Sequence, residues 1–304
     1  MKIAVSAVSF SKNEVLRNEI LAIFPQTYFN VSGKILKSQD LVDFFADSKL
    51  ALVGTEKIDE NVLKNCPNLQ FISKYGVGLD NIDLEACQKY GVQIGWTGGV
   101  NRLSVAEMVL GFMLASSRNL FSTSLQLKNG IWNKNGGFQL SKKTVGIIGV
   151  GCIGKELVRL LKPFDCTILV NDIVEQSNFY KENNLLESSK EEIFQKSDFI
   201  SIHTPLSPLT KHLICEKSLS LMKKNAFLIN TSRGEIVKQD DLHYFLKNNL
   251  IGGAALDVYE EEPCQDLDFL TLPNLICTPH IGGNAQEAVL AMGRSAIEHL
   301  KSFC

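Results

Sequence analysis

The 304-residue chain has a globular composition, with 45% hydrophobic and 21% charged residues, and it is long enough for two domains of ordinary size. A formal net charge of −2 gives no electrostatic basis for binding nucleic acid or an anionic membrane, and no apolar run is long enough to predict a membrane span. The first residues resemble a strand and not a signal peptide. The eight cysteines are scattered and form no metal-binding motif, which predicts reduced thiols in the cytoplasm and no metal site.

Residues 1–97 alternate between strand-like and helix-like segments. Ser38 is a plausible N-cap of the second helix, because a serine hydroxyl can accept a hydrogen bond from a free N–H of the first turn. The alternation predicts a parallel sheet with helices on both faces. We expect strands at 2–5, 27–31, 50–53, 69–73 and 92–95, and helices at 14–24, 38–46, 61–65 and 84–90.

The segment 101–119 has a different pattern. It predicts a helix that is apolar on most of its circumference, and such a helix is expected to be buried between domains or against another subunit. The following residues, 120–137, are more polar and predict a helix and a loop that lead into the next strand.

A glycine-rich turn follows at 149–154. Residues 144–148 predict a buried parallel strand, residues 155–161 have helical spacing, and Gly149, Gly151 and Gly154 between them form GxGxxG. Gly149 is expected to permit the tight turn, Gly151 to let the backbone approach a pyrophosphate, and Gly154 to let the helix pack closely. The pyrophosphate would lie on the free N–H groups at the helix N-terminus.

The next predicted strand, 166–172, ends in Asp172, which lies 18 residues after Gly154. A carboxylate there can accept hydrogen bonds from both hydroxyls of an adenosine ribose. No Arg or Lys follows in 173–177, so a 2′-phosphate would meet acidic charge, and NAD is favoured over NADP. Further strands are expected at 198–203, 226–230, 254–258 and 275–277. The closing helix, 285–300, is expected to fold back onto the first domain because no strand follows it.

Three loops after strands of the second half carry ionisable side chains, namely Arg233, Glu262 and His280. Ligands of open α/β sheets bind at the carboxyl ends of the strands, so these groups could converge beside a nicotinamide. A histidine paired with a carboxylate can transfer a hydroxyl proton, and an arginine can bind a carboxylate and polarise a carbonyl. Taken singly, each residue could equally be an ordinary loop side chain.

The chain resembles the D-isomer-specific 2-hydroxyacid dehydrogenase family, and its motif wording is most similar to short phosphoglycerate dehydrogenases. The similarity extends over nearly the whole chain and follows the order of the family's motifs. Besides the glycine turn, the matching stretches are 75–83 (YGVGLDNID), 101–107 (NRLSVAE), 203–206 (HTPL), 230–234 (NTSRG), 257–263 (DVYEEEP) and 278–283 (TPHIGG).

The resemblance implies roles for individual residues. His280 is expected to be the acid/base, Glu262 its partner and Arg233 the substrate clamp, while the N–H groups of Val77 and Gly78 bind the substrate carboxylate. Arg233 and His280 are expected at both the substrate and the cofactor. The remaining residues implied to line NAD are Ser104, Gly149, Gly151, Cys152, Ile153, Gly154, Asp172, Thr204, Thr231, Ser232 and Asp257.

The resemblance also implies the architecture. It predicts two Rossmann-like, doubly wound α/β domains: a flavodoxin-like substrate domain of residues 1–97 and 285–304, and a central NAD-binding Rossmann domain of residues 98–284. The family is usually dimeric through its long helix, so a homodimer through 101–119 is expected.

The chain departs from the family pattern at three places, and the third of them weakens the case for a phosphorylated substrate. Cys152 stands where the family often has Arg or Lys, Ser104 stands where Thr is common, and the segment at Thr55 lacks an arginine that phosphoglycerate-using members often have. Lys57 or Lys74 could replace that arginine, although Lys and Arg are not equivalent in phosphate recognition.

The first expectation is therefore NAD-dependent oxidation and reduction between a D-2-hydroxyacid and its 2-oxoacid, with 3-phosphoglycerate as the leading substrate. Glyoxylate, hydroxypyruvate and lactate-like acids remain alternatives within the same class. An NAD-sensing binding protein is a remote alternative. Formate oxidation on the same scaffold is disfavoured, because it needs no Glu262–His280 acid/base pair.

Overall fold

The computed structural model describes residues 2–304. The chain forms two compact units, which are described separately: unit 1 is Met1–Asn101 with Ala285–Cys304, and unit 2 is Arg102–Asn284. The predicted domains place residues 98–101 in the second domain, whereas these residues belong to unit 1.

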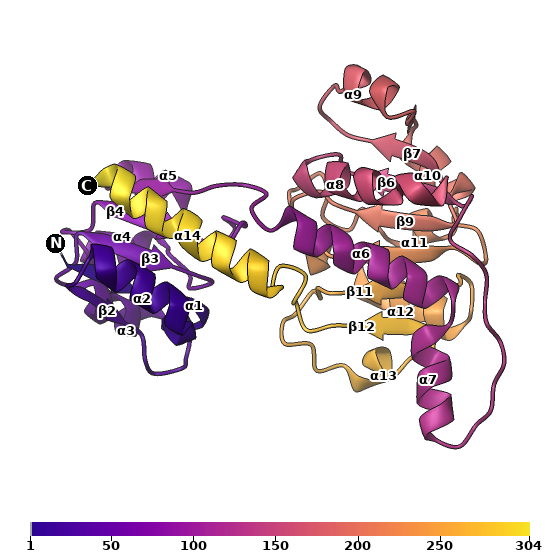
Figure 1. The fold of residues 1–304 in the computed structure, drawn as a ribbon, viewed down its shortest axis with the longest axis horizontal. Coiled ribbons are helices and arrows are strands. Elements are labelled where there is room, and N and C mark those ends of the chain that lie inside the picture. The colour runs from indigo at the N-terminus through magenta and orange to yellow at the C-terminus, as the bar shows by residue number, and fades with distance from the viewer. Residues whose placement is uncertain (1) are drawn as a thin grey trace. The chain divides into compact units, whose positions relative to one another are not determined.

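Unit 1 is a five-stranded parallel sheet with helices on both faces (Figure 1). The strand order is β2-β1-β3-β4-β5, the flavodoxin order. One face is covered by α3, α4 and α5, and the other by α1, α2 and α14. The strands are β1 (Ile3–Val5), β2 (Thr27–Phe29), β3 (Leu50–Val53), β4 (Phe71–Lys74) and β5 (Gln93–Gly95), and the helices are α1 (Val8–Lys12), α2 (Glu14–Ile23), α3 (Ser38–Phe45), α4 (Glu60–Asn65), α5 (Leu84–Lys89) and α14 (Gln286–Phe303).

The C-terminal helix α14 completes unit 1, as predicted. The hydroxyl of Ser73 on β4 donates to the carbonyl of Ala296 at 2.7 Å. Gly293 lies against Leu16 of α2, and a methyl group at this glycine would collide with the leucine side chain. The close approach of the two helices therefore depends on glycine at this position.

In unit 1 one local prediction was wrong and one short helix was missed. Ser38 is not the N-cap of α3: Lys37 has the extended backbone of a cap residue, while Ser38 is already in the helix with φ of 45° and makes no capping hydrogen bond. The short helix α1 was also not predicted, because five residues of mixed polarity give no periodic signal.

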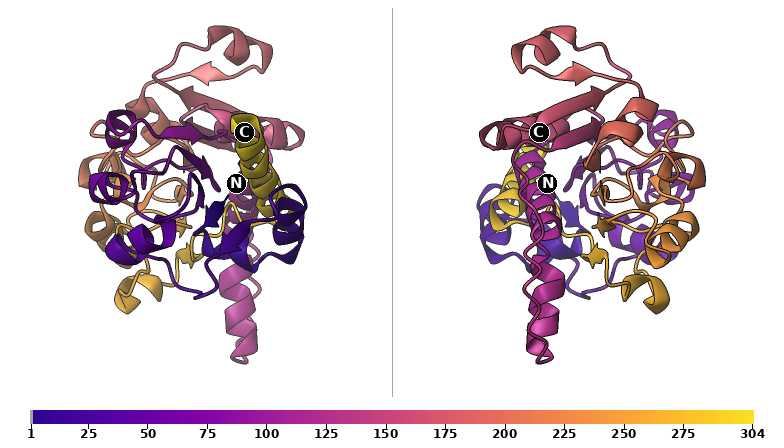
Figure 2. Two further views of the ribbon diagram at one scale, coloured as in Figure 1. Left: turned by 90° about the vertical axis from the view of Figure 1, so that its left-hand side faces the viewer. Right: turned by 90° about the vertical axis from the view of Figure 1, so that its right-hand side faces the viewer.

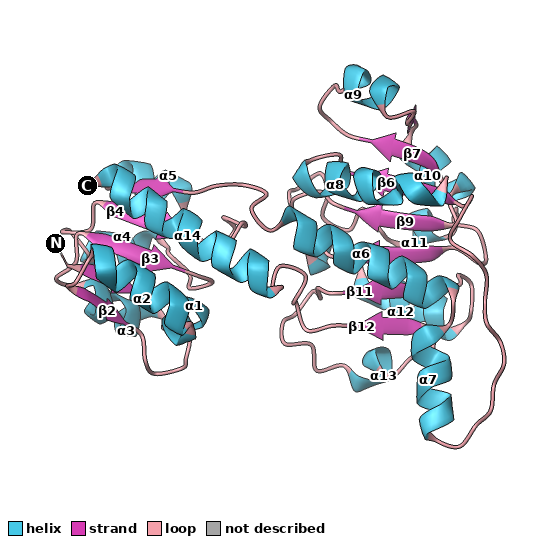
Figure 3. Ribbon diagram, in the orientation of Figure 1, coloured by secondary structure: helices cyan, strands magenta, loops and turns pink. Residues whose placement is uncertain are grey.

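Unit 2 is a seven-stranded parallel sheet, with the order β12-β11-β10-β9-β6-β7-β8 (Figure 3). The first strand of this sheet, β6, lies in its middle. Strands β7 and β8 follow on one side of β6 and β9 to β12 on the other, which is the arrangement of a Rossmann sheet. The strands are β6 (Thr144–Ile148), β7 (Thr167–Asn171), β8 (Leu186–Glu187), β9 (Phe199–Ile202), β10 (Phe227–Asn230), β11 (Gly253–Leu256) and β12 (Leu275–Cys277), and the helices are α6 (Arg102–Ser117), α7 (Leu120–Lys128), α8 (Cys152–Leu161), α9 (Ser177–Glu182), α10 (Lys190–Lys196), α11 (Glu216–Leu219), α12 (Gln239–Lys247) and α13 (Leu267–Leu270).

The long helix α6 is buried by its own unit. Its buried residues, including Val105, Val109 and Met113, belong to the core of unit 2, and α6 packs on α8, β10 and β11. Its buried face is therefore covered by its own unit, and contact of this helix with another domain or subunit stays a prediction. By contrast, α7 buries none of its residues, and it projects away from the sheet of unit 2 (Figure 2).

The predicted fold class is confirmed, since both units are doubly wound α/β sheets. Within residues 2–304, no helix has both the length and the apolar character needed to cross a membrane. The reversal between β6 and β9 marks the edge of unit 2 at which a ligand is expected, the carboxyl ends of the strands.

Candidate active site and cofactor site

The three glycines of the β6–α8 turn have three different structural roles. Gly149 has φ of 96°, and a Cβ there would lie 2.7 Å from the carbonyl carbon of His203. A Cβ on Gly154 would collide with the carbonyl oxygen of Gly149. A Cβ on Gly151 would meet nothing within 4 Å. Gly149 and Gly154 are therefore required by the fold, whereas Gly151 leaves open space above the turn.

The N-terminus of α8 presents free N–H groups beside this space. Gly151 is the N-cap and offers no capping side chain, and Cys152 and Ile153 are the first residues of the ten-residue helix. The Cys152 thiol is exposed, while Ile153 packs against the core of unit 2. Uncapped N–H groups and the positive end of the helix dipole suit an anionic group such as a pyrophosphate.

Asp172 follows β7 and is tied to the glycine turn. Its carboxylate accepts hydrogen bonds from the backbone N–H groups of Val150 at 2.6 Å and Val174 at 2.9 Å. These bonds fix the carboxylate at the carboxyl edge of the sheet and leave lone pairs for ribose hydroxyls. The neighbouring Ile173 is 89% exposed and adds no positive charge for a 2′-phosphate.

Three buried polar atoms at the ends of β9 and β10 have no protein partner within residues 2–304: Nδ1 of His203, Oγ1 of Thr204 and Oγ1 of Thr231. Unsatisfied buried polar groups are costly, and a bound ligand is one explanation for them. Burial lowers the pKa of His203 to about 4, so its ring is neutral, and Nε2 lies 2.9 Å from the hydroxyl of Ser201. Together with the turn and Asp172, these atoms fit a dinucleotide.

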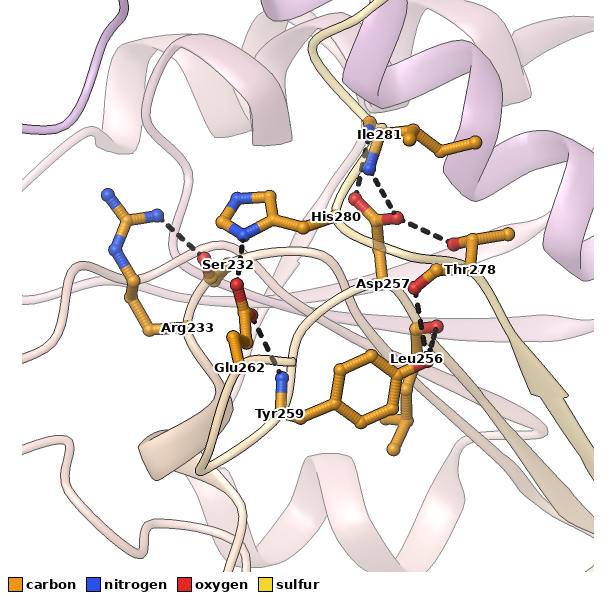
Figure 4. Close-up of polar contacts among 10 residues, drawn as sticks. Ser232, Arg233, Leu256, Asp257, Tyr259, Glu262, Thr278, His280 and Ile281 are labelled. Carbon is orange, nitrogen blue, oxygen red and sulfur yellow. Dashed lines mark hydrogen bonds and ion pairs between the residues drawn. The ribbon is translucent and has the colours of Figure 1, made fainter. Parts of the chain in front are cut away.

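The loops that follow β11 and β12 bring Glu262 and His280 together (Figure 4). Nδ1 of His280 lies 2.7 Å from Oε2 of Glu262, and Oε1 of the glutamate accepts the backbone N–H of Tyr259 at 3.1 Å. The Tyr259 hydroxyl in turn donates to the carbonyl of Thr278 at 3.0 Å, which joins the two loops at a second point. Nδ1 is thus oriented by the carboxylate, and Nε2 is left for proton transfer.

The two groups shift each other's pKa values. The hydrogen bond to Glu262 raises the pKa of His280, against the opposing effects of burial and of the Arg233 charge. Partial burial acts to raise the pKa of Glu262, but the hydrogen bond and the charge of His280 outweigh it, and the pKa is lowered. His280 therefore keeps its proton to a higher pH than an isolated histidine.

Arg233 lies in the loop after β10, whose backbone is held by side chains. The Asn230 amide donates to the Arg233 carbonyl at 2.8 Å, and Ser232 donates its hydroxyl to the Ile202 carbonyl at 2.6 Å. Nη1 of Arg233 donates to the Ser232 carbonyl at 2.7 Å (Figure 4). The charge of Arg233 influences both Glu262 and His280, so the three predicted catalytic side chains share one electrostatic environment.

Asp257 and Ser104 hold the His280 turn. The buried carboxylate of Asp257 accepts the Thr278 hydroxyl at 2.6 Å and the N–H groups of Ile281 and Gly282 at 2.8 and 2.7 Å. Ser104 on α6 donates to the Gly282 carbonyl at 2.6 Å. These bonds support a turn in which His280 has φ of 54°, a conformation that surrounding contacts must stabilise. Cofactor contact by Asp257 and Ser104 stays a prediction.

Val77 and Gly78 lie in unit 1, in the turn after β4. Neither backbone N–H has an acceptor among residues 2–304, and the Val77 carbonyl accepts the indole N–H of Trp96 at 2.8 Å. Lys74, only 6% exposed, directs its ammonium group to the Gly54 carbonyl and to Oδ1 of Asn81, at 2.5 and 2.6 Å. The turn is therefore anchored to its neighbours and still offers two free N–H donors.

Sequence reasoning missed several supporting residues. Tyr259 lies inside the 257–263 stretch, but the contact of its hydroxyl with Thr278 depends on how two loops meet. Trp96 lies outside the matching stretches, and the matching stretch 75–83 contains Asn81 but does not reveal its contact with Lys74. The contacts of Trp96 with Val77 and of Tyr259 with Thr278 join loops that follow different strands, so a local sequence pattern does not reveal them.

Comparisons with known proteins identify the family of the chain. Residues 110–282 match the family model described as D-isomer specific 2-hydroxyacid dehydrogenase, NAD binding domain. The chain is 37% identical over 266 residues to a glyoxylate reductase of Thermococcus litoralis, covering 84% of this chain and 80% of that protein. The predicted resemblance and the predicted cofactor NAD are thereby confirmed.

Two further similarities extend the comparison. The chain is 36% identical over 271 residues to a D-3-phosphoglycerate dehydrogenase of Methanocaldococcus jannaschii, covering 88% of this chain but only 52%, about half, of that protein. The structure resembles that of D-lactate dehydrogenase from Aquifex aeolicus complexed with NAD and lactic acid. The TM-score is 0.86 and the identity 25%, and the match covers 100% of this chain and 95% of that chain.

Proposed function

We propose a function from the premise that this chain belongs to the D-isomer-specific 2-hydroxyacid dehydrogenase family and is an NAD-dependent dehydrogenase. The proposed reaction is the interconversion of a small D-2-hydroxyacid and its 2-oxoacid. The observation that carries the proposal is the 2.7 Å contact between His280 and Glu262 in the electrostatic environment of Arg233.

The residues proposed to hold NAD belong to unit 2. The N-terminus of α8 binds the pyrophosphate beside Gly151, Asp172 binds the adenosine ribose, and Thr204 and Thr231 supply polar atoms that are otherwise unpaired. When bound, NADH supplies the hydride that reduces a carbonyl carbon.

His280 is proposed to transfer the proton. Glu262 fixes the ring through Nδ1 and favours the protonated form, so Nε2 can donate to the carbonyl oxygen of a 2-oxoacid and take the proton back in the reverse direction. Arg233 is proposed to bind and polarise the substrate, because a guanidinium is suited to carboxylate and carbonyl oxygens.

Val77 and Gly78 are proposed to bind the substrate carboxylate through their N–H groups. The proposal is supported by the two N–H donors of this turn, which have no acceptor among residues 2–304. Two adjacent backbone donors form a concave site suited to an anion.

The observed positions of the lysines bear on the substrate. The Lys74 ammonium is buried and bonded to Gly54 and Asn81, while Lys57 is exposed and lies 3.8 Å from the carboxylate of Asp59. This arrangement gives little support to either lysine as a replacement for the absent phosphate-binding arginine. We therefore favour a small unphosphorylated 2-oxoacid, such as glyoxylate or hydroxypyruvate, over the 3-phosphoglycerate predicted first.

The test is NADH oxidation, followed at 340 nm, with glyoxylate, hydroxypyruvate, 3-phosphohydroxypyruvate, pyruvate and 2-oxoglutarate. We expect turnover with glyoxylate or hydroxypyruvate. A strong preference for 3-phosphohydroxypyruvate would overturn the substrate assignment and restore the first prediction. Absence of turnover with every acid, while NADH binds, would overturn the proposed reaction and favour a sensing role or formate oxidation.

A homodimer is part of the proposal. The predicted interface is the helix 101–119. Next to this helix lies a group of exposed apolar side chains, namely Leu120, Phe121, Leu125 and Leu127 on α7, followed by Ile131 and Trp132. We propose that a second copy of the chain covers α7 together with the outer face of α6. Sedimentation velocity distinguishes a dimer from a monomer.

The scattered free cysteines support the proposal that the protein acts in the cytoplasm, where thiols are kept reduced.

A further inference from the structure

Trp96 contacts the turn that is proposed to bind the substrate, although it has no role in the proposed proton or hydride transfer. It follows β5, the strand next to β4, and its indole N–H donates to the Val77 carbonyl at 2.8 Å. Trp96 remains 42% exposed, so burial of the residue does not explain this bond. The bond is local to unit 1 and reaches the turn proposed to bind the substrate carboxylate.

The contact of Trp96 with the Val77 carbonyl also fixes the direction of the Gly78 N–H. In a trans peptide the carbonyl of one residue and the N–H of the next lie in one plane and point in opposite directions. The Val77 carbonyl and the Gly78 N–H belong to the same peptide. A donor that fixes the Val77 carbonyl on one side therefore aims the Gly78 N–H toward the other side.

The turn has little stiffness of its own, so the contact matters. Val77 lies between two glycines, and Gly76 has φ of 124°. One flank is held by Lys74 and the other by Asn81, both bonded to the Gly54 carbonyl. Within residues 2–304, the bond from Trp96 is the anchor of the peptide between those flanks.

We propose that Trp96 is a positioning residue for the substrate, which orients the Val77–Gly78 peptide so that the Gly78 N–H binds the substrate carboxylate. The inference rests on the proposed function, in which this turn binds a 2-oxoacid. Trp96 acts through the peptide and takes no part in proton or hydride transfer.

The test compares Trp96→Phe with the unmodified enzyme, using glyoxylate, hydroxypyruvate and pyruvate. Phenylalanine keeps an aromatic ring but lacks the N–H donor. We expect KM to rise about two- to tenfold, the value of one neutral hydrogen bond, with kcat changed less than twofold. The factor should be similar for every acid that is turned over, because all share the carboxylate, and NADH affinity should be unchanged.

Two further variants make the result specific. Tyr90→Phe removes another exposed side-chain hydrogen bond of unit 1, to Glu60, and should leave KM unchanged. Trp96→Ala should raise KM at least as much as Trp96→Phe. If Trp96→Phe has the KM of the unmodified enzyme, or loses kcat with KM unchanged, the inference is overturned. If the unmodified enzyme turns over none of the acids, the proposed function fails before any variant is compared.

Discussion

Gly151→Ala and Gly154→Ala form a matched pair of substitutions in the proposed cofactor site. Each adds one methyl group, three residues apart. At Gly154 the methyl group collides with the Gly149 carbonyl, which requires a shift of backbone and an expected cost of about 1–3 kcal/mol. For a domain the size of unit 2, that cost lowers Tm by roughly 2–12 °C.

At Gly151 the same methyl group meets nothing within 4 Å, and φ of −76° is accessible to alanine. We therefore expect Tm of Gly151→Ala within about 2 °C of that of the unmodified protein, since only a small loss of N-cap preference is involved. The methyl group projects into the space beside the N-terminus of α8, where the pyrophosphate would lie. We expect NADH affinity to fall at least about tenfold, or 1.4 kcal/mol.

The assays are NADH titration by fluorescence and thermal unfolding by circular dichroism. We expect Gly151→Ala to lower NADH affinity with little change in Tm, and Gly154→Ala to lower Tm. Unchanged NADH affinity in Gly151→Ala would refute the placement of the pyrophosphate. Unchanged Tm in Gly154→Ala would refute the packing argument.

The remaining predictions concern pH and buried charge. Reduction of a 2-oxoacid needs protonated His280, whose pKa is raised, so kcat/KM should be full at low pH and should fall as pH rises through that pKa. Glu262→Gln removes the largest cause of the raised pKa, so the fall should move to lower pH, and an unmoved profile would contradict the pairing. Lys74→Met removes a buried cation from Gly54, Asn81 and the 1% exposed Glu56, with an expected loss of about 3–5 kcal/mol. Urea unfolding measures that loss, and a midpoint equal to that of the unmodified protein would argue against a stabilising network.

The fold could be predicted from sequence to a large extent because its signals are local. Buried parallel strands such as 144–148 appear as continuous β-branched runs, and the alternation of strands with helices limits the topology to doubly wound sheets. The expected packing of the last helix on the first domain is also observed, since α14 contributes to the core of unit 1. The error at α3 has an equally physical reason, because a helix cap depends on backbone angles that a serine alone does not determine.

The candidate site was predictable only where function leaves a motif. The family resemblance predicts that Glu262 and His280 act as a pair, and in the structure the two side chains lie 2.7 Å apart. No sequence motif identifies Trp96 as a positioning residue. Its contact with Val77 arises from the pairing of β5 with β4, and its proposed role arises from the orientation of one peptide. Residues that act through the backbone leave little trace in sequence.

The most direct test of the account is the steady-state kinetics of His280→Ala with the preferred 2-oxoacid, together with its NADH affinity. The account predicts that kcat falls about 10²–10⁴-fold while NADH affinity changes little, because His280 supplies the proton and the proposed pyrophosphate and ribose contacts are made by other residues of unit 2. Turnover within a few-fold of the unmodified enzyme would contradict the assignment of His280 as the acid/base, and with it the proposed mechanism.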